Sequence, residues 1–171
     1  MRMRFFTIFA AGAVLVLFPA CKDKAKEQRH TYLLELMHGN TADPDIAAAM
    51  EKARSSVDDF LSALQKPASN QRQFMVRKSF PSKDAGKQQI LWVTGVTYDG
   101  TNLHGHVDDN TAQQGSGLTK DGVVTFPPTE IADWMFNEDG KAVGGFMLRA
   151  AKAKMTEQEW DGIARQIEFK E

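Results

Sequence analysis

Apolar and polar residues follow two different periods along this chain, and the change of period separates a helical part from a strand-rich part. In the first part, apolar residues recur every three or four positions, which predicts an amphipathic helix; they are Ile46, Met50, Ala53, Val57, Phe60 or Leu61, and Leu64. Asp43 is placed to cap this helix and Pro44 suits its first turn, so we expect the helix to begin there.

Short alternating and β-branched segments predict strands from residue 72 onward. The expected strands lie near residues 74–77, 89–98, 103–107, 122–126 and 142–150. Asp99-Gly100 and Asp139-Gly140 are typical of hairpin turns. Residues 129–136 are expected to form one helical turn, and residues 31–37 a turn of helix or a short strand.

A second helix is expected after residue 155. Thr156 and Glu159 form a capping-box pair, with Met155 and Trp160 at the two staple positions. A helix followed by several antiparallel strands and another helix predicts an α+β fold. We expect an antiparallel sheet of about four to five short strands, with an N-terminal amphipathic helix and a C-terminal helix.

The first twenty residues have the pattern of a bacterial export signal. A basic start precedes an apolar run over residues 5–18, which has the length of a signal core and is too short to span a bilayer. Ala20 and Cys21 follow in an order that resembles a bacterial lipobox, although Phe18 and Pro19 depart from its usual residues. Cys21 is the only cysteine, so no intramolecular disulfide explains it. The sequence therefore predicts cleavage before Cys21 and its acylation. The alternatives are ordinary cleavage after Ala20 and an uncleaved anchor.

This pattern divides the chain into three parts. Residues 1–20 are the expected lipoprotein signal peptide, residues 21–30 the acylated cysteine with a flexible tether, and residues 31–171 a single α+β domain. The lipid makes the membrane an expected partner, with the domain in the cell envelope facing the periplasm. Lys22 stands where an inner-membrane retention signal would place Asp, and by resemblance to enterobacterial sorting this favours the outer membrane.

Composition and charge exclude one class of partner. Hydrophobic residues make up 42% and charged residues 25% of the chain, as in ordinary globular proteins. The net charge is −1, and because the first twenty residues carry two arginines and no acid, the rest carries −3. Nucleic acid is therefore not an expected partner, since binding to phosphates needs a basic field. No motif indicates a cofactor or an oligomeric state.

One local pattern has the spacing of metal ligands. His104, His106 and Asp108 alternate along an expected strand, so their side chains point to the same side and could converge on a cation. The intervening residues are apolar or small, so a solvent-facing polar row on a half-buried strand is the favoured interpretation. We expect no metal and keep these three residues as the metal candidates.

The segment from Phe74 to Arg149 resembles the YegJ-like family of domains of unknown function, number 2314 in that series. The most specific part is Ile131–Met135 followed by Gly144–Arg149, and the other shared elements are Phe74–Lys78, Leu91–Val93, Leu103–Gly105 with Asn110, and Gly122. The resemblance covers residues 72–150 and implies a compact α+β fold. Some members look like lipoproteins, which agrees with the N-terminal pattern, but the resemblance implies no activity.

Asp133, Trp134 and Arg149 lie in this most specific part and are the candidate functional or fold-specifying residues. One interpretation gives Asp133 a catalytic role and makes Trp134 a stacking platform. We favour the other, in which Asp133 caps a turn or pairs with Arg149 while Trp134 fills the core. A buried Asp133–Arg149 pair would specify the fold rather than catalyse a reaction.

No combination of nucleophile, base and oxyanion donor is found, so no catalytic residue is assigned. The leading hypothesis is a membrane-anchored lipoprotein with a non-enzymatic binding or accessory domain, whose partner is another envelope protein. One alternative is a metal-dependent or hydrolytic enzyme built on the region of His104, His106, Asp108 and Asp133. Another is a structural lipoprotein that contacts peptidoglycan.

Overall fold

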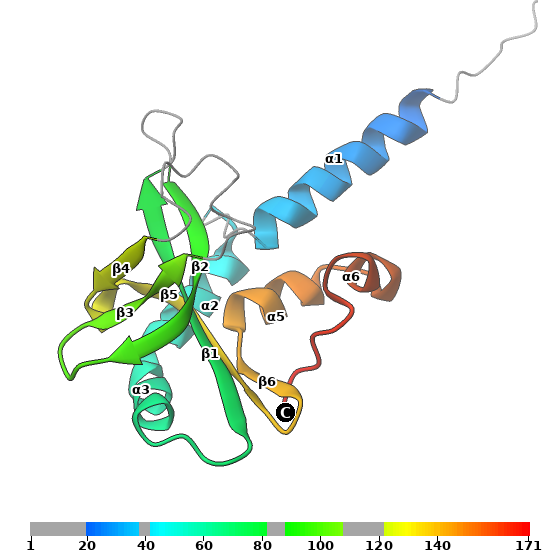
Figure 1. Ribbon diagram of the computed structural model, residues 1–171. Coiled ribbons are helices and arrows are strands. Elements are labelled where there is room, and N and C mark those ends of the chain that lie inside the picture. The colour runs from blue at the N-terminus through cyan, green and yellow to red at the C-terminus, as the bar shows by residue number, and fades with distance from the viewer. Residues whose placement is uncertain (1–19, 38–41, 82–87, 108–121) are drawn as a thin grey trace, which may run out of the picture.

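The computed structural model describes residues 20–37, 42–81, 88–107 and 122–171, and Figure 1 shows their arrangement. These residues form five α-helices, a short 3-10 helix and six strands. In chain order they are α1 (Ala20–Met37), α2 (Pro44–Ser55), α3 (Val57–Gln65), β1 (Gln71–Pro81), β2 (Gln88–Tyr98), β3 (Leu103–Val107), β4 (Val123–Phe126), η1 (Pro128–Glu130), β5 (Ile131–Glu138), β6 (Lys141–Gly144), α5 (Phe146–Ala153) and α6 (Glu157–Ala164).

The six strands form one antiparallel sheet in the order β4-β3-β2-β1-β5-β6. The α+β class is confirmed, and the sheet has more strands than the four to five expected. The additional strand is β5, where the sequence led us to expect one helical turn. Its first four residues are all buried and it pairs with β1 and β6, so it is an interior strand without the simple polar alternation.

The chain leaves the sheet earlier than expected after β6. Residues 142–150 were expected to form one strand, but β6 ends at Gly144 and α5 begins at Phe146. Gly144 and Gly145 have φ angles of +79° and +65°, in the left-handed region that residues with a side chain rarely adopt. Two consecutive residues of this kind end the strand and turn the chain into a helix.

The helix predicted over residues 43–64 is present but consists of two helices. α2 and α3 are separated at Ser56, whose φ of −111° and ψ of 16° are not helical. The predicted cap is confirmed, because a side-chain oxygen of Asp43 accepts hydrogen bonds from the backbone of Asp45 and Ile46. The capping box of Thr156 and Glu159 at the start of α6 is also confirmed.

Helix α1 occupies the residues expected to form a flexible tether and a separate short element. Residues 21–30 are helical throughout, in contrast to the sequence-based expectation. Alanine, lysine, glutamate, glutamine and arginine dominate this stretch, and all of them favour a helix. The last turns of α1 dock on the domain through Leu33, which is 1% exposed, and this contact stabilises the helix.

Helices cover both faces of the sheet. On one face, Ala53 of α2 and Phe60 of α3 pack with Val76, Val93 and Trp134. On the other face lie α5 and α6, which Figure 1 shows side by side on the side away from α3. A strand inside such a sheet buries both of its faces, so consecutive residues point into two different cores.

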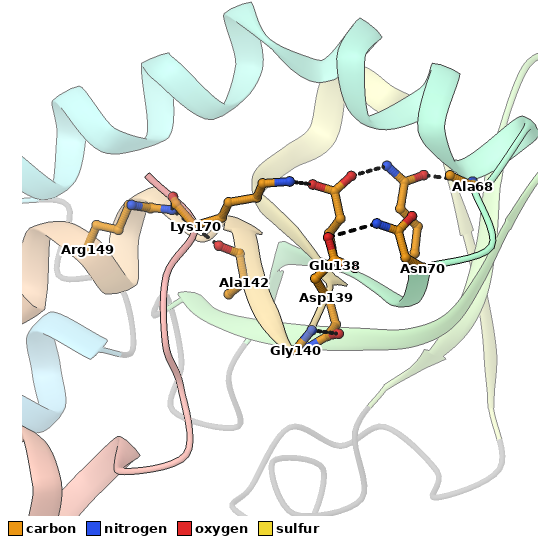
Figure 2. A network of polar contacts seen from close by, with 10 residues as sticks. Ala68, Asn70, Glu138, Asp139, Gly140, Ala142, Arg149 and Lys170 are labelled. Carbon is orange, nitrogen blue, oxygen red and sulfur yellow. Dashed lines mark hydrogen bonds and ion pairs between the residues drawn. The ribbon is translucent and has the colours of Figure 1, made fainter.

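The edge of β6 is covered by the segment after α6. The carbonyl of Glu168 accepts a hydrogen bond from Ala142 N at 2.6 Å, and Lys170 N donates to the carbonyl of Ala142 at 2.8 Å. Figure 2 shows Lys170 beside Ala142, together with the ion pair between Lys170 and Glu138. These bonds occupy backbone groups that an open sheet edge would leave unpaired.

We expect Gly144→Ala to be far more destabilising than Gly140→Ala. Both glycines have positive φ angles, +79° and +85°. A Cβ atom at Gly144 would lie 2.4 Å from the carbonyl oxygen of Trp134, whereas a Cβ at Gly140 meets nothing within 4 Å. The Gly140 variant should lose only the backbone cost of about 1–2 kcal/mol, and the Gly144 variant about 2 kcal/mol more.

Urea unfolding followed by tryptophan fluorescence measures both losses of free energy. Equal losses in the two variants would show that the close approach of Gly144 to Trp134 contributes nothing.

Candidate functional site

Asp133 of β5 lies under the N-terminal end of α5 and is 0% exposed. One carboxylate oxygen accepts hydrogen bonds from the backbone N–H groups of Trp134 and Phe146, at 2.9 and 3.0 Å. The other accepts from Met147 N at 2.9 Å. Phe146 and Met147 are the first two residues of α5, and the N-cap residue Gly145 has no side chain to serve them. Asp133 therefore caps a helix that begins thirteen residues later, whereas the sequence predicted the cap of a turn.

Arg77 of β1 is the Cα partner of Asp133 across the sheet and is 2% exposed. Its guanidinium group lies over the indole ring of Trp92, 5.0 Å from the ring centroid. Nε and Nη1 of Arg77 have no hydrogen-bond partner among the described residues. The hydrogen bonds of Asp133 go to backbone N–H groups, so Arg77 is close to its counter-charge while two of its donors remain unused.

Burial shifts the pKa of each group in the direction that favours its neutral form. Loss of hydration lowers the pKa of the Arg77 guanidinium to about 10, against the opposing charge of Asp133. Burial raises the pKa of Asp133 to about 6, against the backbone N–H of Met147 and the charge of Arg77. At pH 7 both groups are mainly ionised, so the two strands carry a buried pair of opposite charges.

Arg149 does not take the place predicted for it. Instead of pairing with Asp133, its Nε donates to the carbonyl of Gly144 at 2.8 Å, and its Nη2 donates to the carbonyls of Ala142 and Lys170 (Figure 2). The predicted Asp133–Arg149 pair is therefore wrong, and Arg77 supplies the charge opposite Asp133. The reason is the early start of α5, which directs Arg149 towards the β6 edge rather than under the helix.

Trp134 lies in the core, as the favoured interpretation stated. It is 4% exposed, and its indole N–H donates to the carbonyl of Ala53 at 3.0 Å. Its ring packs against Phe60, with ring centroids 5.5 Å apart, and against the edge of Phe146. A buried ring with its polar atom satisfied in this way offers no free face to a ligand.

His104 forms a chain of polar contacts on the other half of the sheet. Its Nε2 lies 2.8 Å from a carboxylate oxygen of Asp99, and its Nδ1 lies 3.0 Å from the hydroxyl oxygen of Thr125. The backbone N–H groups of Asn102, the side chain of His104 and the N–H of Thr101 lower the pKa of Asp99 to about 2. A histidine held between a carboxylate and a hydroxyl can accept the hydroxyl proton, which is the arrangement that activates a nucleophile.

The metal candidates do not assemble into a site within the described residues. His104 uses both ring nitrogens in the contacts above, His106 is exposed on the same face of β3, and Asp108 lies outside the described residues. No group of three or more histidine, cysteine or acidic side chains that could hold a metal occurs in the described part of the chain. Asp133 is separate as well, because β3 and β5 are three strand spacings apart, about 14 Å.

Arg77 and Trp92 are the site residues that the sequence analysis missed. Arg77 alternates with Val76 and reads as a solvent-facing residue of a one-sided strand. A second layer of helices covers that face, so the polar position is buried. One signal could have predicted that Arg77 is buried. Trp92 and its neighbours in β2 are apolar on both faces, which indicates that helices cover both faces of the sheet at this point.

Cys21 is the second residue of α1, in the part of that helix farthest from the sheet (Figure 1). The apolar run over residues 5–18 lies outside the described residues. None of the helices that the described residues form is long and apolar enough to cross a membrane.

The fold and this site define a small α+β domain whose antiparallel sheet is covered on both faces by helices. A family model matches residues 43–169, and this chain therefore belongs to that family, DUF2314, described as uncharacterized protein conserved in bacteria. The match extends beyond residues 72–150, where the sequence alone showed the resemblance, and includes α2, α3 and α6.

A putative ankyrin repeat protein of Neisseria meningitidis serogroup B is 32% identical to this chain over 69 residues. The matched part is 40% of this chain and 27% of that protein, so the chain corresponds to much less than the whole relative. No solved structure matches the chain.

We expect Asp133→Asn to destabilise the domain by about 1–3 kcal/mol at pH 7, because the amide nitrogen of asparagine cannot accept the hydrogen bond from the buried N–H of Met147 at the start of α5. The pKa of Asp133 is about 6 in the folded protein and about 3.9 in an unfolded chain. Its protonation therefore contributes stability that is complete below about pH 4 and is lost as the pH rises through 6.

The difference in unfolding free energy between wild type and Asp133→Asn should consequently be larger at pH 4 than at pH 7. Urea unfolding at both pH values measures it, with Asp161→Asn on the exposed surface of α6 as the control that should change little at either pH. A difference that is constant or smaller at pH 4 would contradict the raised pKa of Asp133.

Proposed function

We propose that this protein is a lipid-anchored protein of the cell envelope whose DUF2314 domain binds a partner rather than catalysing a reaction. The observation that carries the proposal is the order of a basic start, an apolar run over residues 5–18 and Ala20-Cys21, which are the first two residues of α1. Acylation of Cys21 with two or more chains would hold the protein at a membrane, because a single chain binds only reversibly.

Helix α1 supports this proposal as a spacer. Its 18 residues span about 27 Å at 1.5 Å per residue. Contacts with the domain come from the second half of α1: Arg29 pairs with Glu159, Tyr32 bonds to Asp43, and Leu33 is buried. Lys24 and Lys26 near the start of α1 are exposed. A lipid on Cys21 would therefore place the sheet and its helices at a distance from the membrane surface.

Three polar side chains of the candidate site are hydrogen-bonded to the backbone, which supports binding rather than catalysis. Asp133 is occupied by three backbone N–H groups, Arg149 by three backbone carbonyls, and Trp134 by the carbonyl of Ala53. Residues with these tasks hold the fold and cannot also accept and release protons freely.

Cys21→Ser should move the protein from the membrane to the soluble periplasmic fraction and abolish labelling by radioactive palmitate. Membrane fractionation and the intact mass of the purified protein measure the change. An unmodified wild-type chain that begins at Cys21, or one that retains residues 1–20, would overturn the anchor.

Lys22→Asp should retain the acylated protein in the inner membrane, whereas the same charge change at Lys24 should leave it in the outer membrane.

Chemical crosslinking in whole cells followed by affinity purification then tests the partner. A wild-type domain that repeatedly yields no crosslinked envelope protein contradicts the binding role.

The contact chain of Asp99, His104 and Thr125 favours one second candidate, a hydrolytic activity with Thr125 as nucleophile. The hydroxyl oxygen of Thr125 would attack the carbonyl carbon of an ester or amide, while His104 takes the hydroxyl proton and Asp99 orients the ring. His104 would pass this proton to the departing alcohol or amine, and water would then release the acyl group from Thr125. This candidate replaces the broader alternative based on His104, His106, Asp108 and Asp133, because β3 and β5 keep His104 and Asp133 apart.

If the second candidate holds, a fluorophosphonate probe labels wild-type protein, and Thr125→Val and His104→Ala each abolish the labelling. The control is Thr129→Val, which alters an exposed threonine of η1 outside this contact chain and should leave the labelling intact. Absence of labelling in the wild type removes the hydrolytic candidate.

A further inference from the structure

The segment after α6 lies on the edge of β6 as a short extra strand, and we call its residues 168–170 the strap. Its backbone bonds to Ala142 through the carbonyl of Glu168 and the N–H of Lys170, and Phe169 is bridged to Ala142 in the parallel direction. Arg149 joins the two, because its Nη2 donates to the carbonyls of Ala142 and Lys170, at 3.2 and 2.7 Å. Figure 1 shows the chain returning from α6 to the end of β6. The edge of β6 therefore holds an extended segment, which the chain itself supplies.

Two side chains of the strap occupy positions with defined chemistry. The ring of Phe169 lies under the guanidinium group of Arg149, 4.4 Å from the ring centroid, and packs against the ring of Trp160 at 5.9 Å between centroids. The ammonium group of Lys170 forms an ion pair with Glu138, whose side chain is only 17% exposed (Figure 2). The β6 edge thus accepts an aromatic residue followed directly by a basic residue.

The strap is held more weakly than the strands of the sheet. Three surface depressions of about 350, 420 and 460 Å³ all border Ile167, the residue just before it, so this part of the chain has open space on several sides. Phe169 is only half-buried, and Glu168 and Lys170 are exposed. An exposed ion pair contributes little to stability. Segments with few buried contacts open at a lower free energy than the whole domain, so the strap can leave β6 while the sheet stays folded.

We propose that the edge of β6 binds an extended segment of a partner protein, in which an aromatic residue is followed by lysine or arginine, and that the strap occupies this site until the partner displaces it. The partner's backbone pairs with Ala142, its ring lies on Arg149, and its basic side chain reaches Glu138. In strand addition of this kind, main-chain bonds supply affinity and side chains supply specificity. The inference rests on the binding role proposed above and is independent of the lipid on Cys21.

The test uses a fluorescein-labelled peptide that copies residues 165–171, and its anisotropy is recorded as the purified full chain is added. Phe169→Ala in the protein removes the ring of the strap and leaves the residues of β6 unchanged. We expect saturable one-to-one binding, about tenfold tighter for Phe169→Ala than for wild type, because the observed affinity is proportional to the fraction of molecules with an open site. Gln166→Ala, which alters an exposed side chain just outside the strap, is the matched control and should retain the wild-type affinity.

Altered peptides test the two specificity positions. Against the Phe169→Ala protein, peptides with Phe169→Ala or Lys170→Glu should bind about tenfold more weakly than the unchanged peptide. A peptide with Glu168→Ala should bind as the unchanged peptide does, since that side chain is exposed and only its carbonyl is used. Hydrogen exchange locates the site: the N–H of Ala142 should be protected in wild type, exchange rapidly in Phe169→Ala, and become protected again when the peptide is added.

If Phe169→Ala does not fold, as judged by circular dichroism, Lys170→Ala replaces it. That variant removes only an exposed side chain and its ion pair, and should bind the peptide about threefold more tightly than wild type.

The proposal is overturned if the opened variant shows no saturable binding, if it binds no more tightly than wild type, or if the peptide without its aromatic ring binds equally well. A wild-type dimer in sedimentation that Phe169→Ala dissociates would place the strap of a second copy on β6, and would also overturn the partner. The titration involves neither membranes nor crosslinking. Failure of this site is therefore distinguishable from failure of the anchor and from the absence of a crosslinked envelope protein.

Discussion

The first two N–H groups of α5 bond to a carboxylate that is supplied by a strand, not by the preceding loop. Asp133 thereby fixes the distance and direction of α5 relative to β5. The next residue, Trp134, points to the opposite face and bonds through its indole to α2, while its own carbonyl accepts from Gly145 N at 2.8 Å. Two consecutive residues thus fasten one helix on each face of the sheet, and a Cβ at Gly144 would collide with the carbonyl oxygen and the ring of the second of them, Trp134.

The cost of this arrangement appears at Arg77. A carboxylate buried under a helix needs a nearby positive charge, and the strand beside β5 provides one that is equally buried. Because backbone N–H groups take the oxygens of Asp133, the guanidinium group interacts with its counter-charge and with the ring of Trp92 but leaves two donors unused. The structural role of Asp133 therefore leaves two buried donors of Arg77 without an acceptor among the described residues.

Sequence periodicity was sufficient for elements that obey one period throughout. The caps at Asp43 and Thr156, the strands that became β1 to β4 and the α+β class all followed from local patterns. Periodicity failed for β5, because a strand buried on both faces loses the alternation that identifies strands. It also failed for α5, because the positive φ angles of Gly144 and Gly145 are not evident from the sequence. The stretch after Cys21 was taken for a tether because its charged residues mask a strong helix propensity.

Local sequence patterns identified two residues of the candidate site but not the residue paired with Asp133 across the sheet. Asp133 and Trp134 were identified because the motif that contains them is specific, and their structural roles followed from ordinary rules for buried polar groups. The pairing with Arg77 depends on strand register, which sets a residue of β1 opposite one of β5 more than fifty positions away. No local pattern encodes that register, so Arg149, which is nearer in the sequence, was the mistaken choice.

The strand-like contact of residues 168–170 with β6 has a consequence for the order in which the chain folds. A polypeptide is released from the ribosome and from an export channel N-terminal end first, so β6 emerges before the segment that covers its edge. During that interval the edge of β6 is an open template for pairing with other chains. The domain can become fully protected from such pairing only after Phe169 and Lys170 have emerged, so its last step of folding depends on the final residues of the described chain.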